Sequence, residues 1–275
     1  MSRALLAALL LLAAPPLFAA QRIVALAPSL AELVCAAGAC DQLVGVVAHT
    51  DYPEPAAALP QVGDAFSFSL ERVLQLKPTL VLAWDGGNAR EQVERLQSLK
   101  LKVQWIRVQS LDDVATVLEQ LGDRLGTAPA ARTAAAEFRN GLKSLAETHG
   151  QGARVRVLYQ IEADPIYTVN HDSTISQAIS LCGGVNVFAT MPVLSAVVSR
   201  EAVLAANPDV IVFARSDGVA RIRADWSHWP EIAAVREGHV FAIDATTLER
   251  PAPRMLAGIR ELCDVLELAR PVPQK

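Results

Sequence analysis

The histidines and acidic side chains are the residues of this chain that could hold a metal ion or transfer protons in a reaction. The five histidines stand singly along 275 residues, and no two have the helical spacing of metal ligands: His49, His149, His171, His228 and His239. The sequence contains neither a G-x-S-x-G nucleophile turn nor a phosphate-binding G-x-G-x-x-G loop. We therefore expect the protein to have no metal site, no cofactor and no enzymatic activity. A reactive group at His49 and Asp51, beside Tyr52, is the alternative, although hydrogen bonding within a loop explains both residues better.

The four cysteines can form disulfide bonds. Their number is even, and none has the paired spacing of zinc ligands. We predict that Cys182 pairs with Cys263 and Cys35 with Cys40, although three pairings are formally possible. Two buried free thiols are the alternative for Cys35 and Cys40. Closing the long loop between Cys182 and Cys263 stabilises a fold by ~4–5 kcal/mol in the chain-entropy model.

Residues 1–20 have the order of an export signal. One arginine precedes an apolar block that is too short to span a bilayer, and small residues follow it. We expect cleavage near Ala20, a mature chain beginning near Gln21, and a location outside the cytoplasm. No later stretch is apolar enough for a transmembrane helix. The net charge of −4 and the pI of about 5.8 give no basic surface for nucleic acid.

One sequence pattern occurs twice. SLERVLQLKPTLVL at 69–82 returns as SREAVLAANPDVIV at 199–212, with a glutamate, a Val-Leu pair and a proline in register. Each copy predicts a short helix that the proline ends and a buried strand that follows it. Glu71 and Glu201 then occupy equivalent positions in two related lobes. A carboxylate near a helix N-terminus stabilises the helix by ~0.3–1 kcal/mol. That effect explains either glutamate alone, whereas two lobes side by side would present both on one face.

Short apolar strands alternate with helices along most of the chain. We predict strands at 22–26, 43–47, 79–83, 103–108, 156–160, 210–214 and 240–243, and helices at 70–76, 88–99, 111–125, 173–181 and 199–205. This alternation is typical of an α/β fold with largely parallel sheets. The glycine-rich turn at 85–88 fits a strand-to-helix connection with Asn88 as the helix N-cap.

A long stretch without strand character divides the chain. Its alanine-rich pattern predicts a single helix of ~30 Å, enough to bridge two lobes. The predicted organisation is two Rossmann-like lobes joined by this helix. Its parts are a signal peptide at 1–20, an N-terminal lobe at 21–127, the linking helix at 128–150 and a C-terminal lobe at 151–275.

Four stretches resemble the helical-backbone, or class III, periplasmic binding proteins, which serve ABC importers of metal chelates. They are HTDYP (49–53), SLERVLQLKPTLVLAWDGGN (69–88), SREAVLAANPDVIV (199–212) and ERPAPR (249–254). The resemblance covers nearly the whole mature chain and is greatest to the members that bind cobalamin. It implies a ligand cleft between two lobes that hardly close, because the linking helix is stiff. The implied ligand is cobalamin or a related corrinoid, which a monomer delivers to a permease dimer with its ATPase subunits.

The resemblance also implies which residues line the cleft. Tyr52 and Trp84 match aromatic positions that contact the corrin in the family, and Tyr167 falls where the family has a cleft phenylalanine. A corrin is large, flat at its rim and fringed with amides, so aromatic faces and a few hydrogen bonds suit it. Core packing is the alternative for Trp84, which stands at the end of a predicted strand.

The sequence departs from the family at three cleft positions. Ala65 and Ser195 stand where the family has tryptophans, and Thr246 begins the pair that replaces an acid and a tryptophan before ERPAPR. The cleft is therefore poorer in large aromatic side chains. Phe66 and Phe68 are the aromatic residues that we expect to compensate from the same loop.

The resemblance also assigns positions to four charged residues, two at the permease and two in or near the cleft. Glu71 and Glu201 correspond to glutamates that meet arginines on the two permease subunits, where charge pairs set orientation and encounter rate. Arg250 and Arg254 match family positions, with a place in the cleft or a structural salt bridge as the two interpretations.

Haem and a ferric siderophore are the rival ligands within the same family. Tyr52, Tyr167 or His49 could serve as an axial ligand to haem iron. A siderophore would need basic cleft residues, for which Arg250 is the clear candidate.

Overall fold

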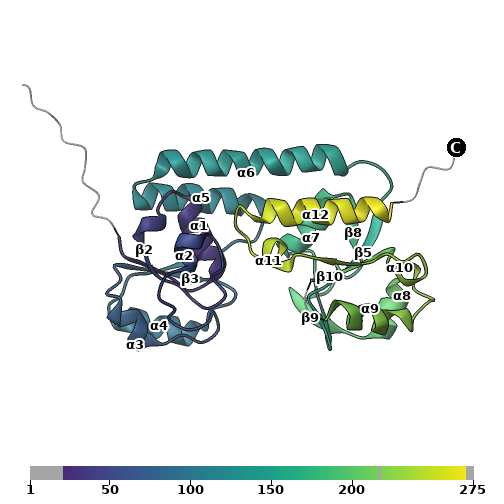
Figure 1. The fold of residues 1–275 in the computed structure, drawn as a ribbon, viewed down its shortest axis with the longest axis horizontal. Coiled ribbons are helices and arrows are strands. Elements are labelled where there is room, and N and C mark those ends of the chain that lie inside the picture. The colour runs from purple at the N-terminus through teal and green to yellow at the C-terminus, as the bar shows by residue number, and fades with distance from the viewer. Residues whose placement is uncertain (1–20, 216–217, 271–275) are drawn as a thin grey trace, which may run out of the picture.

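The computed structural model describes residues 21–215 and 218–270, so the expected signal peptide lies outside the described residues. Two α/β lobes stand side by side beneath one long helix, α6 (Ala128–His149), which begins over the N-terminal lobe and ends over the C-terminal lobe (Figure 1). Its 22 residues correspond to ~33 Å of helix. The predicted fold class is thus confirmed. In the described part of the chain, no helix is long and apolar enough to cross a membrane.

The N-terminal lobe is built on a parallel sheet with the strand order β2-β1-β3-β4. Its strands are β1 (Ile23–Ala25), β2 (Leu43–Gly45), β3 (Leu80–Trp84) and β4 (Val103–Ile106). Its helices are α1 (Pro28–Ala36), the short 3₁₀ helix η1 (Cys40–Gln42), α2 (Glu54–Ala57), α3 (Leu70–Gln75), α4 (Arg90–Ser98) and α5 (Leu111–Leu125).

The C-terminal lobe repeats this sheet with the order β8-β5-β10-β11, also parallel. Its strands are β5 (Val155–Gln160), β8 (Gly184–Asn186), β10 (Val210–Ala214) and β11 (Val240–Ile243). Its helices are α7 (Thr174–Leu181), α8 (Arg200–Ala206), α9 (Val219–Ser227), α10 (Ala233–Arg236), α11 (Ala245–Leu248) and α12 (Met255–Leu268).

A small antiparallel sheet in the C-terminal lobe was not among the predicted elements. It has the order β6-β7-β9 and consists of β6 (Glu162–Ala163), β7 (Ile166–Val169) and β9 (Ser195–Val198). The prediction missed it because strands of two to four residues are too short to show a periodic pattern.

The sequence repeat corresponds to a repeated structure. Ser69 and Ser199 are the N-caps of α3 and α8, and the hydroxyl of each accepts a hydrogen bond from the backbone N–H three residues on, at 3.2 Å. Both helices end before a residue with positive φ, 47° at Lys77 and 42° at Asn207. The buried prolines and the strands β3 and β10 follow.

The arginine at the start of each lobe completes the repeat. Arg22 donates from Nη2 to the carbonyl of Leu76 at 2.7 Å, and Arg156 donates from Nη2 to the carbonyl of Ala206 at 2.6 Å. Each guanidinium thus satisfies carbonyls at the C-terminus of the repeated helix, which otherwise lack partners. The two lobes are therefore equivalent in detail and not only in strand order.

Both faces of each sheet are covered, as the continuous apolar strands require. Alternate residues of β3 and β10 point to opposite faces. Leu82 and Val212 join a core cluster on the side of α6, whereas Val81 and Ile211 join separate clusters on the outer faces. The cluster beside α6 is continuous through both lobes and includes Phe138 of α6. The lobes therefore share one core.

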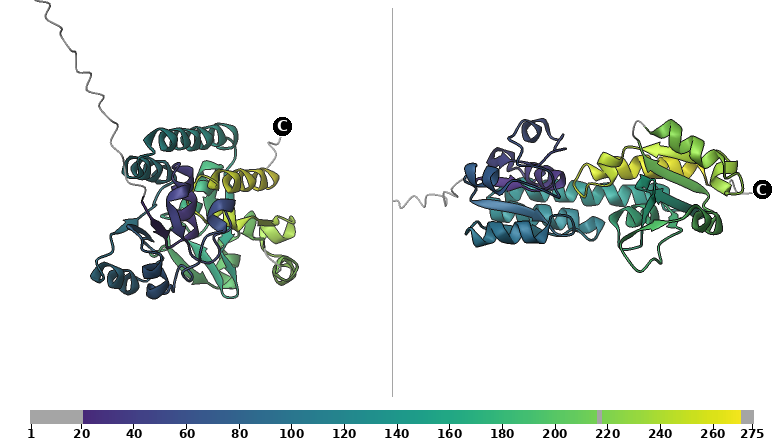
Figure 2. Two further views of the ribbon diagram at one scale, coloured as in Figure 1. Left: turned by 60° about the vertical axis from the view of Figure 1, so that its left-hand side comes forward. Right: turned by 90° about the horizontal axis from the view of Figure 1, so that it is seen from below.

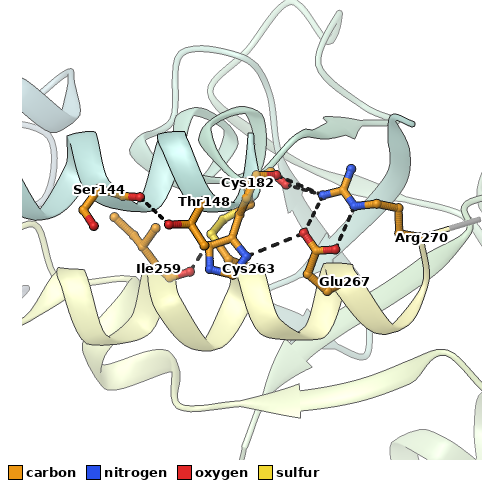
Figure 3. The surroundings of a disulfide bond; sticks show 8 residues. Ser144, Thr148, Cys182, Ile259, Cys263, Glu267 and Arg270 are labelled. Atoms are coloured by element: carbon orange, nitrogen blue, oxygen red, sulfur yellow. Dashed lines mark hydrogen bonds and ion pairs between the residues drawn. A yellow bond between two sulfur atoms is a disulfide. The ribbon is translucent and has the colours of Figure 1, made fainter. Parts of the chain in front are cut away.

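Three helices form a layer along one side of the molecule. α5 and α6 pack against each other as a hairpin, and α12 packs on α6, as seen from a second direction (Figure 2). Arg270, just after α12, donates to the carbonyls of His149 at 3.0 Å and Cys182 at 3.1 Å (Figure 3). This contact fastens the last helix to the end of the linking helix.

Two disulfide bonds are present, with the predicted pairing. Cys182 follows α7 and bonds Cys263 in the middle of α12, across a sequence separation of 81 residues (Figure 3). Cys35 at the end of α1 bonds Cys40 in η1, five residues later. The long-range bond ties α12 to the C-terminal lobe, and the short one closes a single turn.

Candidate functional site

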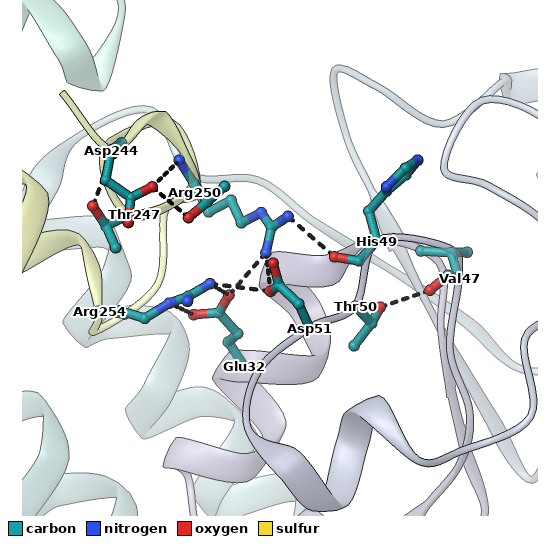
Figure 4. Close-up of polar contacts among 10 residues, drawn as sticks. Glu32, Val47, His49, Thr50, Asp51, Asp244, Thr247, Arg250 and Arg254 are labelled. Atoms are coloured by element: carbon teal, nitrogen blue, oxygen red, sulfur yellow. Dashed lines mark hydrogen bonds and ion pairs between the residues drawn. The ribbon is translucent and has the colours of Figure 1, made fainter. Parts of the chain in front are cut away.

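Four charged side chains from the two lobes meet where residues 249–254 approach α1 and the loop at 49–53 (Figure 4). We call Glu32, Asp51, Arg250 and Arg254 the interlobe cluster. Arg254 donates to Glu32 twice, from Nη2 to Oε1 at 2.8 Å and from Nε to Oε2 at 3.3 Å. Arg250 donates from Nη1 to Asp51 Oδ1 at 2.6 Å. Both arginines, predicted as cleft or salt-bridge residues, are thus in salt bridges between the lobes.

Burial differs between the two acids of the cluster, and their pKa values move in opposite directions. Glu32 is 3% exposed, and burial raises its pKa above 4.5 against the lowering effect of Arg254 and Arg250. Asp51 is more exposed. Its partial burial is outweighed by the hydrogen bond and charge of Arg250, so its pKa lies below 3.8. The cluster therefore holds one carboxylate that is costly to ionise and one that ionises readily.

A second polar contact joins the lobes on the side of α5. Gln177 of α7 accepts a hydrogen bond from the backbone N–H of Leu111 at 3.0 Å and donates to the carbonyl of Gln109 at 2.8 Å. The lobes are thus fixed to each other by the interlobe cluster, by Gln177 and by the shared core.

Tyr52 lies directly beside the interlobe cluster. The guanidinium carbon of Arg254 is 4.6 Å from the centroid of its ring, in the geometry of a cation–π contact. The ring remains 48% exposed. Arg254 therefore covers one face of the Tyr52 ring and leaves apolar surface open to solvent.

Phe66 is the most exposed of the predicted cleft aromatics, at 69%. Asp64 holds its loop, because Oδ1 accepts hydrogen bonds from the backbone N–H groups of Phe66 and Ser67 at 2.8 and 2.7 Å. Gly63 has φ of 139°, and a Cβ there would lie 2.6 Å from Phe68 Cα. Phe68 is 6% exposed and packs in the outer core, so the expectation that it lines the cleft is wrong.

Trp84 is half-buried at the end of β3 and packs against the core beside α6. Its ring lies over Gly87, where a Cβ would come within 1.9 Å of two ring carbons. Glycine is therefore needed at position 87 to admit the ring. Asn88 is not the N-cap of α4, which is Ala89 without a side-chain bond, so this prediction is wrong.

Asn88 instead ties three segments together, because its carboxamide bonds backbone groups in each of them. Its Oδ1 accepts from the N–H of Trp84 at 2.6 Å, and its Nδ2 donates to the carbonyls of Leu26 at 2.8 Å and Ala65 at 2.6 Å. It is 8% exposed. Asn88 thus positions both the Trp84 strand end and the Phe66 loop, a role that the sequence reasoning missed.

Tyr167 lies on the antiparallel sheet of the C-terminal lobe and is 38% exposed. It is paired across the sheet with Val197, which is 52% exposed, so the two side chains share one face. Val193 and Leu194, just before β9, are also more than half exposed. This lobe therefore presents an apolar surface around Tyr167.

His49, Asp51 and Thr246 make hydrogen bonds or salt bridges within the chain and do not form a reactive group. The carbonyl of His49 accepts from Arg250 Nη2 at 3.1 Å, and its ring points away from the carboxylate of Asp51 (Figure 4). Thr246, at the start of α11, bonds with its N–H and its hydroxyl to Asp244 Oδ1 at 2.9 and 2.6 Å. Within residues 21–215 and 218–270, no group of three or more His, Cys, Asp or Glu side chains could hold a metal ion.

Glu71 and Glu201 lie exposed in the first turns of α3 and α8, one in each lobe. Both helices are on the side of the molecule away from α6 (Figure 1). Glu71 accepts from Gln75 Nε2 at 3.2 Å. A hydrogen bond from Ser199 lowers the pKa of Glu201, which keeps its charge at neutral pH.

A model of the family described as periplasmic binding protein matches residues 23–247. The chain belongs to this family. It is 35% identical to the vitamin B12-binding protein of Vibrio cholerae over 261 residues, 94% of this chain and 93% of the relative. It is 36% identical to the vitamin B12-binding protein of Salmonella typhimurium over 267 residues, 97% of each chain.

Solved structures superpose on this fold. The periplasmic vitamin B12-binding protein of Vibrio cholerae superposes with a TM-score of 0.83 at 33% identity, covering 90% of this chain and 97% of that one. A periplasmic haem-binding protein from Pseudomonas aeruginosa superposes with a TM-score of 0.79 at 24% identity, covering 91% and 94%. The second likeness shows the fold alone.

Proposed function

We propose that this protein captures cobalamin or a related corrinoid in the periplasm and delivers it to an ABC importer of the inner membrane. Family membership indicates a substrate-binding protein and not an enzyme. The observation that carries the proposal is the set of three exposed aromatic rings, Tyr52, Phe66 and Tyr167, supplied by loops of one lobe and the small sheet of the other. Such rings suit a large, flat ligand.

The ligand class rests on the relatives. Proteins named as vitamin B12-binding match at 33–36% identity over nearly the whole chain, whereas the haem-binding structures match at 21–24%. Corrinoids are therefore better supported than haem. Trp84, which is half-buried, would contribute the accessible part of its ring, and Thr246 and Arg250 would contribute from α11 and the segment after it.

Titration of the purified mature protein distinguishes the ligands. Cyanocobalamin should bind saturably in calorimetry at one molecule per chain, and haemin and ferric siderophores should not compete with it. Tyr52→Ala should weaken cyanocobalamin binding by ~1–2 kcal/mol, because the variant lacks the apolar ring area that the ligand would bury. Leu99→Ala, which removes a side chain of similar exposure (49%), is the matched control. Saturable haemin binding without cyanocobalamin binding would replace the proposal with a haem carrier.

Delivery would use Glu71 and Glu201. The equivalent placement of the two glutamates in the two lobes supports docking to a permease dimer, one carboxylate for each subunit. Charge pairs of this kind set orientation and encounter rate more than affinity. The protein would act as a monomer, because one chain already supplies both anchors.

A further inference from the structure

A cavity of about 190 Å³ lies at the carboxyl ends of β5 and β10, in the C-terminal lobe. Phe213 and Ile222 line its apolar part, and Gln160, Glu162 and Arg221 are its polar side chains. Carboxyl ends of parallel strands are the usual place for ligand contacts in α/β proteins. The cavity is therefore in a position to receive part of a ligand.

Gln160 lines this cavity and has unused hydrogen-bonding capacity. Its side chain is 2% exposed, and its Oε1 accepts a hydrogen bond from Trp226 Nε1 at 2.9 Å. That bond fixes which end of the carboxamide is oxygen. Among the described residues, Gln160 Nε2, which has two N–H donors, makes no hydrogen bond to an acceptor of the chain. This amide group is not sealed off from solvent, so it is available to an acceptor that enters the cavity.

Glu162 and Arg221 supply complementary groups. In the described residues neither side chain has a salt bridge or a hydrogen bond to another side chain. The cavity thus offers one carboxylate acceptor, from Glu162, and N–H donors from two side chains, Gln160 and Arg221. A primary carboxamide matches this set, since its N–H₂ donates and its carbonyl oxygen accepts two bonds. A free carboxylate does not match it, because Glu162 repels a second negative charge.

The cavity adjoins the aromatic surface assigned to the ligand. Glu162 on β6 is paired directly with Tyr167 on β7, so the two side chains lie on the same face of the small sheet. Gln160 follows Tyr159, whose hydroxyl bonds Glu249 at 2.9 Å. The next residue, Arg250, contacts Asp51 of the other lobe. A ligand on Tyr167 would therefore pass close to the cavity.

We propose that this cavity binds one propionamide arm of the corrinoid, with Glu162 accepting from the arm's N–H₂ and with Gln160 and Arg221 donating to its carbonyl oxygen. This inference rests on the proposed function and names the part of the ligand that the C-terminal lobe recognises. It also gives a chemical reason for selecting a corrinoid, whose arms end in amides, over haem, whose arms end in carboxylates.

The monocarboxylic acids of cyanocobalamin, each with one propionamide hydrolysed, test the inference by calorimetry. The wild-type protein should bind one of these acids about tenfold or more weakly than cyanocobalamin and the others nearly as well. Glu162→Gln should remove most of that difference, because a glutamine N–H₂ can donate to the new carboxylate. Arg221→Ala should weaken cyanocobalamin binding by about fivefold or more, and Arg223→Ala, on the same helix, should not.

The outcomes separate this inference from the proposed function. If cyanocobalamin does not bind the wild-type protein, the proposed function fails and the inference with it. If cyanocobalamin binds but all the acids bind equally well, or the penalty for one acid persists in Glu162→Gln, the inference alone is overturned. Thermal unfolding of each ligand-free variant checks that the substitutions at these exposed positions leave the fold intact.

Discussion

Arg254 of the C-terminal lobe holds the buried carboxylate of Glu32 in the N-terminal lobe through two hydrogen bonds, 222 residues apart in the sequence. The same guanidinium covers one face of Tyr52. One side chain therefore fixes both the contact between the lobes and the orientation of a candidate ligand-binding ring.

Removal of this arginine should destabilise the protein more at neutral pH than at acid pH. Arg254→Ala leaves Glu32 buried without its main partner, and breaking a buried pair costs ~3–5 kcal/mol. Burial already raises the pKa of Glu32, and loss of Arg254 raises it further, so the folded variant resists ionisation. Stability is then lost as pH rises above 4.5 towards the higher folded pKa. Urea unfolding at pH 5 and pH 7 measures the loss.

The exposed pair of Arg95 and Glu91 is the control for this experiment, with side chains 62% and 80% exposed. Glu91→Ala should cost less than ~1 kcal/mol at either pH. A loss in Arg254→Ala that is equal at pH 5 and pH 7 would contradict the assigned burial of Glu32.

Asn88→Ala should reduce both stability and ligand affinity. The substitution removes the Asn88 bonds of the Trp84 N–H and of the Leu26 and Ala65 carbonyls, at a cost of ~1–3 kcal/mol for each group that is left buried and unpaired. The Phe66 loop also loses an anchor, so cyanocobalamin affinity should fall although Asn88 is itself buried. Asn140→Ala, at an exposed position on α6, is the matched control. Unchanged affinity in a folded Asn88→Ala protein would show that the loop holds its position by other contacts.

A substitution at the N-terminus of α5 should destabilise the protein with the opposite pH dependence to that of Arg254→Ala. Asp113 is only partly buried, and its hydrogen bonds from Gln109 and Ser110 outweigh that burial and lower its pKa below 3.8. Its contribution to stability is therefore present above pH 3.8 and lost as pH falls through the folded pKa. Asp113→Asn should cost ~0.5–2 kcal/mol at pH 7. Unfolding by guanidinium chloride at pH 7 and pH 3 measures the effect. The free energy of unfolding of the variant should differ less from that of wild type at pH 3 than at pH 7.

The Cys182–Cys263 bond should matter more than the Cys35–Cys40 bond. Replacing the first pair with serines opens a loop of 81 residues and should cost ~4–5 kcal/mol, whereas replacing the second opens a five-residue loop and should cost ~2 kcal/mol. Thermal unfolding of the two double variants compares them directly. A larger loss for the short loop would show that strain or contacts, and not chain entropy, decide the effect.

Charge reversal at the two docking candidates should impair uptake but not binding. The double variant Glu71→Lys and Glu201→Lys should bind cyanocobalamin like wild type and reduce corrinoid uptake by about tenfold or more, because like charges at an interface cost several kcal/mol. Each single alanine variant should show a small defect, as exposed pairs contribute ~0–1 kcal/mol.

The matched control makes the same charge change on the opposite side of the molecule. Glu137→Lys with Glu147→Lys places two lysines on exposed positions of α6 and should leave uptake normal. Equal uptake in both double variants would leave the repeated glutamates as a product of lobe duplication without a role in docking.

The lobes were predictable because the information is local. The proline after each repeated helix and the apolar run after it indicate helix and strand without knowledge of distant residues. Arg22 and Arg156 were an additional signal of the repeat, since each stands at the start of an equivalent strand, but their function depends on carbonyls 54 and 50 residues away.

The site was less predictable because its contacts join distant segments. Asn88 has the sequence signature of a helix cap, yet its partners are 4, 23 and 62 residues away. Glu32 stands alone among apolar residues of α1, which signals a buried acid, but nothing local indicates that its partner is Arg254. Phe66 and Phe68 look alike in the sequence, and only the bridge between Gly63 and Phe68 shows which of the two is buried.

The equivalence of α3 and α8 has a consequence for how the protein would meet a receiver built from two like subunits. A molecule with a single anchor would reach only one of the two subunits in any one orientation. Here the cap, the glutamate and the helix end are the same in both lobes. A rotation by half a turn about the axis between the lobes exchanges one anchor for the other, so either arrival presents a carboxylate to each subunit. The duplication would thereby let one docked chain engage both subunits at once.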